Sequence, residues 1–513
     1  MATPQPFRVT SVPGIKRDST VFEGPNYTDG LWNRFTRRGN PRKIAGYKSI
    51  TSHLSEIVRG INSFAIDATN YLHLGSQSFL TQVQTDFAGN LGAQTNRTPS
   101  GFIPNVNNLW QVDAFYNKVG GATAVVAHAG QNLSDIAGST ESPIYYGPID
   151  GTGALTASAM DPVSGGILPV PPYLLAFSNG GRVDVSATND LTSPTANSTF
   201  VTAQKIVRGL ALRNSSTPAG ILWSLDTLVT AVFDPSLTAA SGIPTFDFNE
   251  VATISILSSR GPVELDSIYY WPGVDRFWMY NGIARELPNN MNTDFFFENV
   301  NFAQRQKAFS FTVPRWGEVW FCAPLFGASE CNWAIIYNTI LQTWYDTPLP
   351  DGGRSAGIFA KVFQFPYMCD VDQTSTGYTL WQHETGLDKV QGTSVLPIPA
   401  YYQTHEMSPI DAPQNAVDKA FRVGIIEPDF VQSGDITCTV FARANARVAP
   451  VASANLTIPA APILAGDPGN QVSELKWNGR LLSFRFGSNT PGGNYEAGKV
   501  MAHMEVTDGR FTQ

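Results

Sequence analysis

The stretch Ser267-Ile-Tyr-Tyr-Trp271 is followed by the turn residues Pro272-Gly-Val-Asp275 and then by Arg276-Phe-Trp-Met-Tyr280. Two β-branched and aromatic runs separated by Gly, Pro and Asp are typical of two strands joined by a turn. The pattern recurs every ~45 to 55 residues, which is the period of a propeller blade, a four-stranded sheet repeated around an axis. The later copies are Glu318-Val-Trp-Phe321 with Trp333-Ala-Ile-Ile-Tyr337, and Phe365-Pro-Tyr-Met-Cys369 with Gly377-Tyr-Thr-Leu-Trp381.

Further strand signals extend this series toward the N-terminus. We therefore predict an irregular β-propeller of six to eight blades over residues 56–395, with seven favoured. Within it, Gly147 to Val170 is rich in Gly, Ala, Ser and Pro and is predicted to be a long loop, and Asn179-Gly-Gly181 is predicted to be a hairpin turn. The additional strand signals include Ser63–Ile66, Tyr71–Leu74, Phe79–Val83, Ala122–Ala127, Tyr173–Phe177, Arg182–Val185 and Leu222–Phe233.

The pattern changes after the linker-like Leu396-Pro-Ile-Pro399. Longer runs follow, such as Leu481–Phe486 and Val500–Val506, in which apolar and polar residues alternate. Alternation over six or more positions gives a strand one wet and one buried face, which predicts a separate antiparallel β-sandwich-like domain over 396–513. Helix signals are scarce, and the two best are Asn292–Lys307 and Ala416–Phe421. The fold class expected is all-β.

Residues 1–55 are predicted to be an extended N-terminal arm with turns. Between Leu31 and Lys48 this arm has six cationic residues, no acidic residue and several aromatic residues. Three interpretations are open: a solvated loop edge, a docking arm against an acidic partner, or a phosphate contact near DNA. The candidate contact residues are Trp32, Arg34, Arg37, Arg38, Arg42, Lys43 and Lys48.

The composition supports an all-β chain with neutral polar loops. Charged residues make up 15% of the 513 residues, against about 25% in an average soluble domain. Aromatic residues make up 12%, and the chain has 45 Gly and 35 Pro. The net charge of −8 argues against a general nucleic-acid binder, which needs a basic surface. It does not exclude a protein past which DNA merely slides.

Cysteine spacing and hydropathy exclude several classes of protein. Cys322, Cys331, Cys369 and Cys438 show no CxxC spacing, so we expect buried free thiols rather than a zinc site or a disulfide framework. The N-terminus lacks a basic and then apolar leader, which predicts a chain that is not secreted. No run of about 18 apolar residues occurs, which predicts that the chain does not span a membrane.

Motifs that would indicate catalysis or metal binding are incomplete. Gly493 to Val500 fits seven places of a phosphate-binding loop, but the eighth is Val instead of Ser or Thr, so we predict a hairpin turn. Asp370 to Thr374 alternates oxygens like a calcium loop but lacks its Gly and distal Glu, and is predicted to be a polar loop. The carboxylates Glu264, Asp266, Asp275 and Glu286 share one repeat, and surface positions explain them equally well. We predict no catalytic, cofactor-binding or metal site, and a protein that is not an enzyme.

The order of these parts resembles the packaged-DNA stabilisation proteins, also called tail hub or nozzle proteins, of short-tailed bacteriophages. The similarity covers most of the chain. It rests on the order of loosely similar strand motifs and on the overall architecture, with no invariant signature. The residues that carry it are Pro41-Arg-Lys-Ile-Ala-Gly46-Tyr-Lys-Ser-Ile50, Trp278-Met-Tyr-Asn281, Asn292-Thr-Asp-Phe-Phe-Phe-Glu298, Phe309-Ser-Phe-Thr312, Ala334–Asn338, Trp344-Tyr345-Asp346 and Tyr378–Trp381, followed by a β-rich tail.

The resemblance implies a structural virion protein of the tail that is made in the host cytoplasm. It implies a homo-hexameric ring below the portal and its adaptor ring. That ring would extend the channel for double-stranded DNA without reading its sequence, help retain the packaged genome, and offer attachment to tailspike or fibre proteins. No cofactor is implied.

Two other functions are compatible with the residues. One is a carbohydrate-binding or glycan-degrading propeller of the spike type, in which the many aromatic side chains stack on sugar rings. The other is a receptor-binding or scaffold propeller with no channel role.

Overall fold

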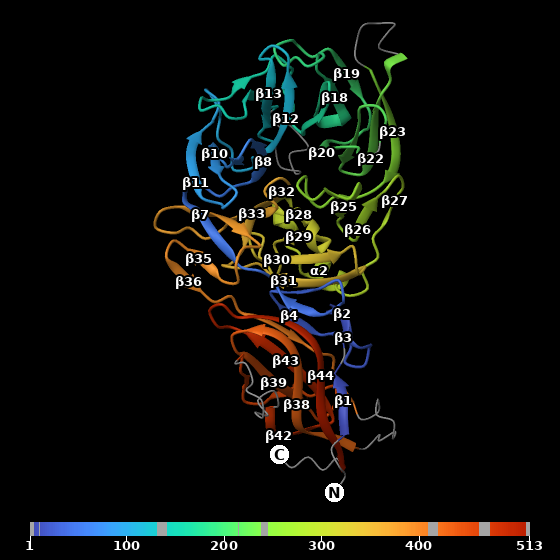
Figure 1. Cartoon of the computed structure of the whole chain (residues 1–513). Helices are drawn as coiled ribbons and strands as arrows, with labels where there is room; N and C mark the ends of the chain where they lie inside the picture. Colours follow the sequence, from blue (N-terminus) through green and yellow to red (C-terminus); the bar gives the residue numbers. More distant parts are fainter. Residues whose placement is uncertain are drawn as a thin grey trace.

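The computed structural model describes residues 5–9, 11–130, 141–213, 215–236, 245–408, 419–460 and 472–508. Figure 1 shows two β-rich parts: a ring of sheets, coloured from blue through green to orange, and below it a stem that contains the red C-terminal strands. The ring is a β-propeller and the stem is a β-sandwich, as the sequence predicts. The N-terminal segment runs between them.

Seven four-stranded antiparallel units make up the propeller within the described residues, and we number these blades 1 to 7 in chain order. Blade 1 contains β8 (Gly60–Ile66), β9 (Thr69–Gly75), β10 (Leu80–Thr85) and β11 (Leu91–Asn96). Blade 2 contains β12 (Gln111–Asn117), β13 (Ala122–His128), β14 (Tyr145–Pro148) and β15 (Thr156–Ala157). Blade 3 contains β16 (Gly166–Val170), β17 (Tyr173–Phe177), β18 (Arg182–Val185) and β19 (Asn197–Phe200).

Blades 4 to 6 contain the recurrent aromatic runs. Blade 4 contains β20 (Ile206–Ala211), β21 (Ala219–Ser224), β22 (Thr227–Phe233) and β23 (Phe246–Thr253). Blade 5 contains β24 (Val263–Leu265), β25 (Ile268–Pro272), β26 (Phe277–Tyr280) and β27 (Ala284–Glu286). Blade 6 contains β28 (Phe309–Val313), β29 (Glu318–Ala323), β30 (Trp333–Asn338) and β31 (Thr343–Pro348).

Blade 7 joins the two ends of the propeller sequence. It contains β32 (Arg354–Ala360), β33 (Phe365–Asp370) and β34 (Tyr378–His383), and its fourth strand is β7 (Tyr47–Leu54) from the N-terminal segment. The hairpin β35 (Lys389–Gln391) and β36 (Ser394–Leu396) extends the same sheet beyond β7. The inner strand β8 contacts both β12 and β32, so blade 7 packs against blade 1 and the ring closes. Closure leaves the propeller without an open first or last blade.

The sandwich has two sheets, and each sheet combines strands from the N-terminal and the C-terminal parts of the chain. In the first, β44 (Asn494–Asp508) lies between β38 (Lys419–Ser433) and β6 (Pro41–Lys43), with β42 (Val472–Gly479), β5 (Asn33–Phe35) and β1 (Gln5–Val9) around them. The second is ordered β4 (Asp29–Leu31), β37 (Ala400–Gln403), β43 (Leu481–Ser488), β39 (Ile436–Arg443) and β40 (Val451–Ala452), with β41 (Leu456–Ile458) also on β39. The short parallel pair β2 (Val12–Ile15) and β3 (Asn26–Tyr27) lies against β31 of blade 6.

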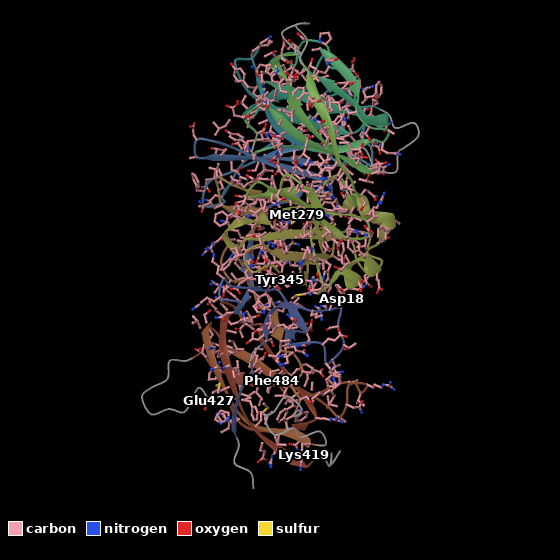
Figure 2. The ribbon with its side chains drawn as sticks, turned by 90° about the vertical axis from the view of Figure 1, so that its right-hand side faces the viewer. Asp18, Met279, Tyr345, Lys419, Glu427 and Phe484 are labelled. Carbon is pink, nitrogen blue, oxygen red and sulfur yellow. The ribbon has the colours of Figure 1, made fainter. Side chains whose placement is uncertain are left out.

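The predicted arm is extended, but it is not a separate unit, because its strands pair with strands of the sandwich and of the propeller. Strands β1, β4, β5 and β6 belong to the sandwich, and β7 belongs to the propeller. One hydrophobic cluster runs through the junction and contains Phe484 of the sandwich, Phe35 of the arm and Trp320 of blade 6. Figure 2 shows Tyr345 between Met279 in the propeller and Phe484 in the sandwich, at the level of the junction.

Helices are short and few in the described residues. The predicted helical region 292–307 is confirmed as α2 (Thr293–Asn299) followed by the 3-10 turn η2 (Phe302–Lys307). Two further 3-10 turns are η1 (Asn179–Gly181) and η3 (Pro314–Trp316). The first of these is the predicted hairpin turn, and positive φ at Gly180 (59°) and Gly181 (69°) explains its glycines.

Two predictions, a helix and a long loop, are wrong. The predicted helix 416–421 is strand β38 from Lys419 onward, because Phe421, Val423 and Ile426 face the sandwich core; residues 416–418 lie outside the described residues. The predicted loop 147–170 contains β15 and the fully buried inner strand β16. A strand buried on both faces shows no alternation, and Pro169 is tolerated because an inner strand has one unpaired edge.

The predictions for the cysteines and for the loop after Asp370 are confirmed. All four cysteines are free and buried. The predicted hairpin turn Gly493 to Val500 is wrong for all but Gly493, because strand β44 begins at Asn494 and the turn lies just before the stretch. The loop after Asp370 joins β33 to β34, and the Asp370 carboxylate accepts hydrogen bonds from the Thr379 amide and the Trp381 indole. None of the helices in the described ranges has the length and hydropathy needed to span a bilayer.

Candidate functional site

A cavity of about 510 Å³ lies between the inner strands of the propeller. Residues of β8, β12, β20, β24, β28 and β32 line it, so six of the seven blades contribute. We call it the axial cavity. Its volume is in the range of sites that hold small molecules.

The axial cavity is lined by four cationic and two acidic side chains. The acidic residues are Asp113 of β12 and Glu264 of β24. Glu264 accepts a hydrogen bond from the Ser267 amide, and its Oε2 lies 3.3 Å from Nζ of Lys361 and 4.0 Å from Nε of Arg213. One of the two carboxylates is therefore already held by the protein.

Asp113 and Arg208 form the charged centre of the axial cavity. The Asp113 carboxylate is open to the cavity, yet protein surrounds it, and burial raises its pKa while Arg208 and Arg213 oppose the rise. Burial lowers the pKa of Arg208, and Asp113 opposes that change. A β-bulge between Ile206 and Arg208 interrupts the regular alternation of side-chain direction along β20 at this point.

Arg260 fixes the wall of the cavity between blades 5, 6 and 7. Its guanidinium donates hydrogen bonds to the carbonyl oxygens of Arg59 and Ser355, both at 2.9 Å, and to that of Lys307. Burial lowers its pKa to about 10. Its two Nη atoms hold three backbone segments together and so have a structural role.

The predicted basic patch lies elsewhere, at the junction of propeller and sandwich. Arg34 is 1% exposed and is held by two carboxylates. Its Nε lies 2.9 Å from Oε1 of Glu318, its Nη2 donates to Glu318 at 3.0 Å, and both Nη atoms donate to Glu384 at 2.6 and 2.8 Å. The Trp320 indole and the Tyr345 hydroxyl donate to the same Glu318 carboxylate at 2.8 and 2.6 Å.

The electrostatics of this cluster favour a charged Arg34. Despite the desolvation cost of burial, Glu318 and Glu384 raise the pKa of Arg34. Burial raises the pKa of Glu318, and Arg34 with the donors Tyr345 and Trp320 opposes that rise. Such a pair is strongly destabilised by loss of either partner, because the other charge is then left buried and unpaired.

The structure separates the seven candidate contact residues into buried and accessible groups. Trp32 and Lys43 are buried like Arg34: the Trp32 indole donates to the Ala45 carbonyl, and the Lys43 ammonium donates to the Gly493 carbonyl at 2.8 Å. These three side chains are used inside the chain and present no surface to a partner or to DNA. The four accessible residues are Arg37 and Arg38, which are exposed, and Arg42 and Lys48, which are partly exposed.

Arg38 and Arg42 share the carboxylate of Glu496 in β44. Arg38 forms an ion pair with Oε1, and Nη1 of Arg42 lies 3.3 Å from Oε2. Lys48 donates to the Ala88 carbonyl in blade 1. These contacts leave Arg37 and Arg38 as the most accessible cations of the patch, and their contact with a partner or DNA stays a prediction.

A second ion-pair network at the junction includes residues that the sequence did not single out. Arg17 lies 2.8 Å from Asp29 and 3.1 Å from the fully buried Asp346 of blade 6. Asp29 also pairs with Arg485 of β43 at 3.0 Å. The network therefore joins blade 6, the N-terminal segment and the sandwich. Asp346 lies 329 residues from Arg17 along the chain, and Arg485 lies 456 residues from Asp29, so sequence spacing gave no signal for the network.

Other candidate groups from the sequence do not converge. Of the four carboxylates in blade 5, Glu264 lines the axial cavity, whereas Asp275 and Glu286 form surface ion pairs with Arg276. His73 and His128 are buried singly, and burial lowers their pKa values to about 3 and about 4. In the described part of the chain, no group of three or more His, Cys, Asp or Glu side chains is placed to hold a metal ion.

Comparison with known proteins gives matches among solved structures only. No family model and no curated protein matches the chain. Among the similar solved structures is that of BBS1N in complex with ARL6DN, with 9% identity, a TM-score of 0.40, and coverage of 67% of this chain and 98% of that one. The WD40 β-propeller domain of Doa1 has 8% identity, a TM-score of 0.38, and coverage of 66% and 97%. A chain of the mitotic checkpoint complex has 10% identity, a TM-score of 0.36, and coverage of 74% and 96%.

Proposed function

We propose that the protein is a structural subunit of the tail nozzle, or hub, of a short-tailed bacteriophage. In this role six copies form a ring below the portal and its adaptor, extend the DNA channel, help retain the packaged genome and hold tailspikes or fibres. The protein acts in the virion by its shape, after synthesis in the host cytoplasm, and makes or breaks no bonds. The resemblance of the ordered strand motifs to that family supports this role.

The observation that carries the proposal is the extensive contact between propeller and sandwich, which makes the two domains a single rigid unit. Two domains joined only by a linker move relative to each other by default. Here residues of the N-terminal segment enter both sandwich sheets and blade 7, and the hydrophobic cluster is continuous between the two parts. Two ion-pair networks cross the same boundary: the one centred on Arg34 is buried, and the one centred on Arg17 is partly buried. Such construction suits a wall element that must keep its shape under internal pressure.

The charge distribution agrees with passage of DNA rather than binding. The net charge is −8, and three of the basic-patch residues are buried within the chain. A mildly acidic wall does not hold phosphates, so DNA slides past it. The exposed Arg37 and Arg38 are placed to dock an acidic surface of the adaptor or a neighbouring subunit, since arginine is a common anchor at interfaces.

Native mass spectrometry of the full chain, alone and mixed with the portal–adaptor ring, tests this role. We expect sixfold assemblies, and we expect the double variant Arg37→Glu/Arg38→Glu to lose them while the fold is kept. Arg447→Glu, which reverses an exposed charge in the connection between β39 and β40, is the matched control and should still assemble. A monomer in every mixture, or electron microscopy that places the chain outside the tail, would refute the proposal.

A glycan-degrading propeller is the second candidate, and the two carboxylates in the axial cavity are the observation that favours it. Glycoside hydrolysis requires two carboxyl groups that flank the bond. Glu264, however, is already hydrogen-bonded by the Ser267 amide and paired with Lys361. Hydrolysis of a glycan panel by the full chain, lost in both Asp113→Asn and Glu264→Gln, would favour this candidate over the nozzle.

A further inference from the structure

Three residues that line the axial cavity each have one buried polar atom without a hydrogen-bond partner in the described residues. These atoms are Nε of Arg208, Nε of Arg260 and Oγ of Ser310. They come from β20, the segment before β24, and β28, so three successive blades contribute one each. Buried donors are almost always satisfied, by protein or by something bound. These three atoms have almost no accessible surface, so a ligand in the cavity would bind to other polar atoms of the lining residues.

Arg208 is the strongest of these groups. Arg260 uses its two Nη atoms on backbone carbonyls, whereas the Arg208 guanidinium makes no hydrogen bond to any described residue. The neighbouring Asp113 influences it through charge alone. A guanidinium is a planar fork that matches a carboxylate or phosphate with two parallel hydrogen bonds. The free fork therefore favours an anionic group on the ligand.

Asp113 supplies the complementary acceptor. Its Oδ1 accepts a hydrogen bond from the Ala114 amide at 2.8 Å, and within the described residues its Oδ2 accepts none. A carboxylate open to a cavity accepts hydrogen bonds from hydroxyl groups. The site thus offers one guanidinium fork for an oxyanion and one carboxylate for hydroxyl groups.

We propose that the axial cavity binds a small organic anion that also carries hydroxyl groups, such as a sugar acid. Its carboxylate pairs with Arg208, and its hydroxyl groups bond to Asp113. The cavity volume of about 510 Å³ fits a ligand of this size, and the excess of cationic over acidic lining residues favours an anion. The site does not depend on the nozzle role.

Isothermal titration calorimetry of the full chain with glucuronate, glucose and inorganic phosphate tests the proposal. We expect saturable glucuronate binding that exceeds both glucose and phosphate binding, because each of these lacks one half of the recognised chemistry. Arg208→Met should weaken glucuronate binding roughly tenfold to a hundredfold, the loss of a hydrogen-bonded charge. Asp113→Asn should weaken glucuronate binding and leave phosphate binding unchanged.

Two further variants keep the test decisive if Arg208→Met folds poorly. Arg208→Lys keeps the charge and loses the fork, so it should weaken glucuronate binding several-fold. Arg447→Met removes an exposed arginine outside the cavity and should bind glucuronate like the unmodified chain. The proposal is overturned by absence of saturable binding, by equal binding of glucose or phosphate, or by undiminished binding in the Arg208 variants.

Discussion

Arg34 is the residue whose removal should most weaken the junction between propeller and sandwich. Arg34→Met leaves Glu318 buried with no countercharge, so we expect a loss of roughly 3–5 kcal/mol in the free energy of unfolding. Urea denaturation followed by tryptophan fluorescence measures it. Arg37→Met, three positions away on an exposed side chain, should change the value by no more than about 0.5 kcal/mol. Equal effects of the two variants would contradict the structural role of Arg34.

Lys43 should make stability depend on pH. Burial lowers its folded-state pKa from 10.5 to about 8, although Asp388 opposes the change. Between pH 8 and 10.5 the folded chain has lost this proton while the unfolded chain keeps it. The unfolded state then binds more protons, so the contribution of Lys43 to the free energy of unfolding rises with pH across this window.

The Lys43→Met variant isolates this contribution from the titration of tyrosines. We expect the difference in unfolding free energy between the variant and the unmodified chain to be largest below pH 8, in favour of the variant, and to shrink as pH rises toward 10.5. Denaturation midpoints measured at several pH values give this difference. A difference that stays constant across the window would show that Lys43 is charged in both states.

At the scale of single elements, helix α2 depends on a residue from far away in the chain. The carboxylate of Asp18 accepts hydrogen bonds from the amides of Asp294 and Phe295 at 2.9 and 2.8 Å, whereas Asn292 at the N-cap position makes no side-chain cap bond. Loss of a helix cap costs about 0.5–2 kcal/mol. Asp18→Ala should lower the free energy of unfolding by that amount in a chemical denaturation experiment.

The matched control for this cap is Asp18→Asn. The amide keeps one oxygen acceptor and loses the charge that favours a helix N-terminus, so its effect should be smaller than that of Ala. Figure 2 shows Asp18 at the level of the junction, close to Tyr345 in height. An equal loss in both variants would mean that the charge, and not the hydrogen bond, carries the stabilisation.

Strand β7 is the element that closes the propeller. It pairs with β34 along Tyr47 to Leu54, and Ile50 and Leu54 lie in the hydrophobic cluster between blades 7 and 1. Deleting residues 1–54 should therefore abolish folding of the propeller, seen as loss of the near-ultraviolet circular dichroism signal. Deleting residues 1–9 removes only β1, a strand that pairs with β44 alone, and should leave that signal in place. A folded propeller without residues 1–54 would contradict closure by β7.

The elements also show why sequence reasoning reached the fold but not the site. Half-buried strands and the hairpin glycines at 180 and 181 leave a local pattern, and these were predicted correctly. Strand β16 is buried on both faces and contains Pro169, so its pattern is that of a loop. Arg34 and Lys43 are buried because their partners, Glu318 and the Gly493 carbonyl, lie hundreds of residues away in the chain. The spacing of residues in the sequence cannot reveal such partners.

At the scale of the whole molecule, the net charge of −8 decides how the protein meets DNA. Binding to duplex DNA comes chiefly from cations that displace counterions from phosphates. Of the seven candidate contact residues, only Arg37 and Arg38 are exposed, and Arg38 is paired with Glu496. The full chain should therefore not shift the fluorescence anisotropy of a labelled duplex at micromolar concentration and about 0.15 M salt, where even non-specific binders have dissociation constants of roughly 10⁻⁴ to 10⁻⁶ M.

Lower salt makes the same experiment informative about the arginines. Binding that emerges at about 0.02 M salt should disappear in Arg37→Glu/Arg38→Glu and persist in Arg447→Glu, because only the first variant removes the exposed part of the patch. Micromolar binding at physiological salt, with a steep dependence on salt concentration, would contradict this prediction. Tight binding of this kind would also contradict the proposed channel role, because a channel wall that binds DNA tightly would slow the exit of the genome.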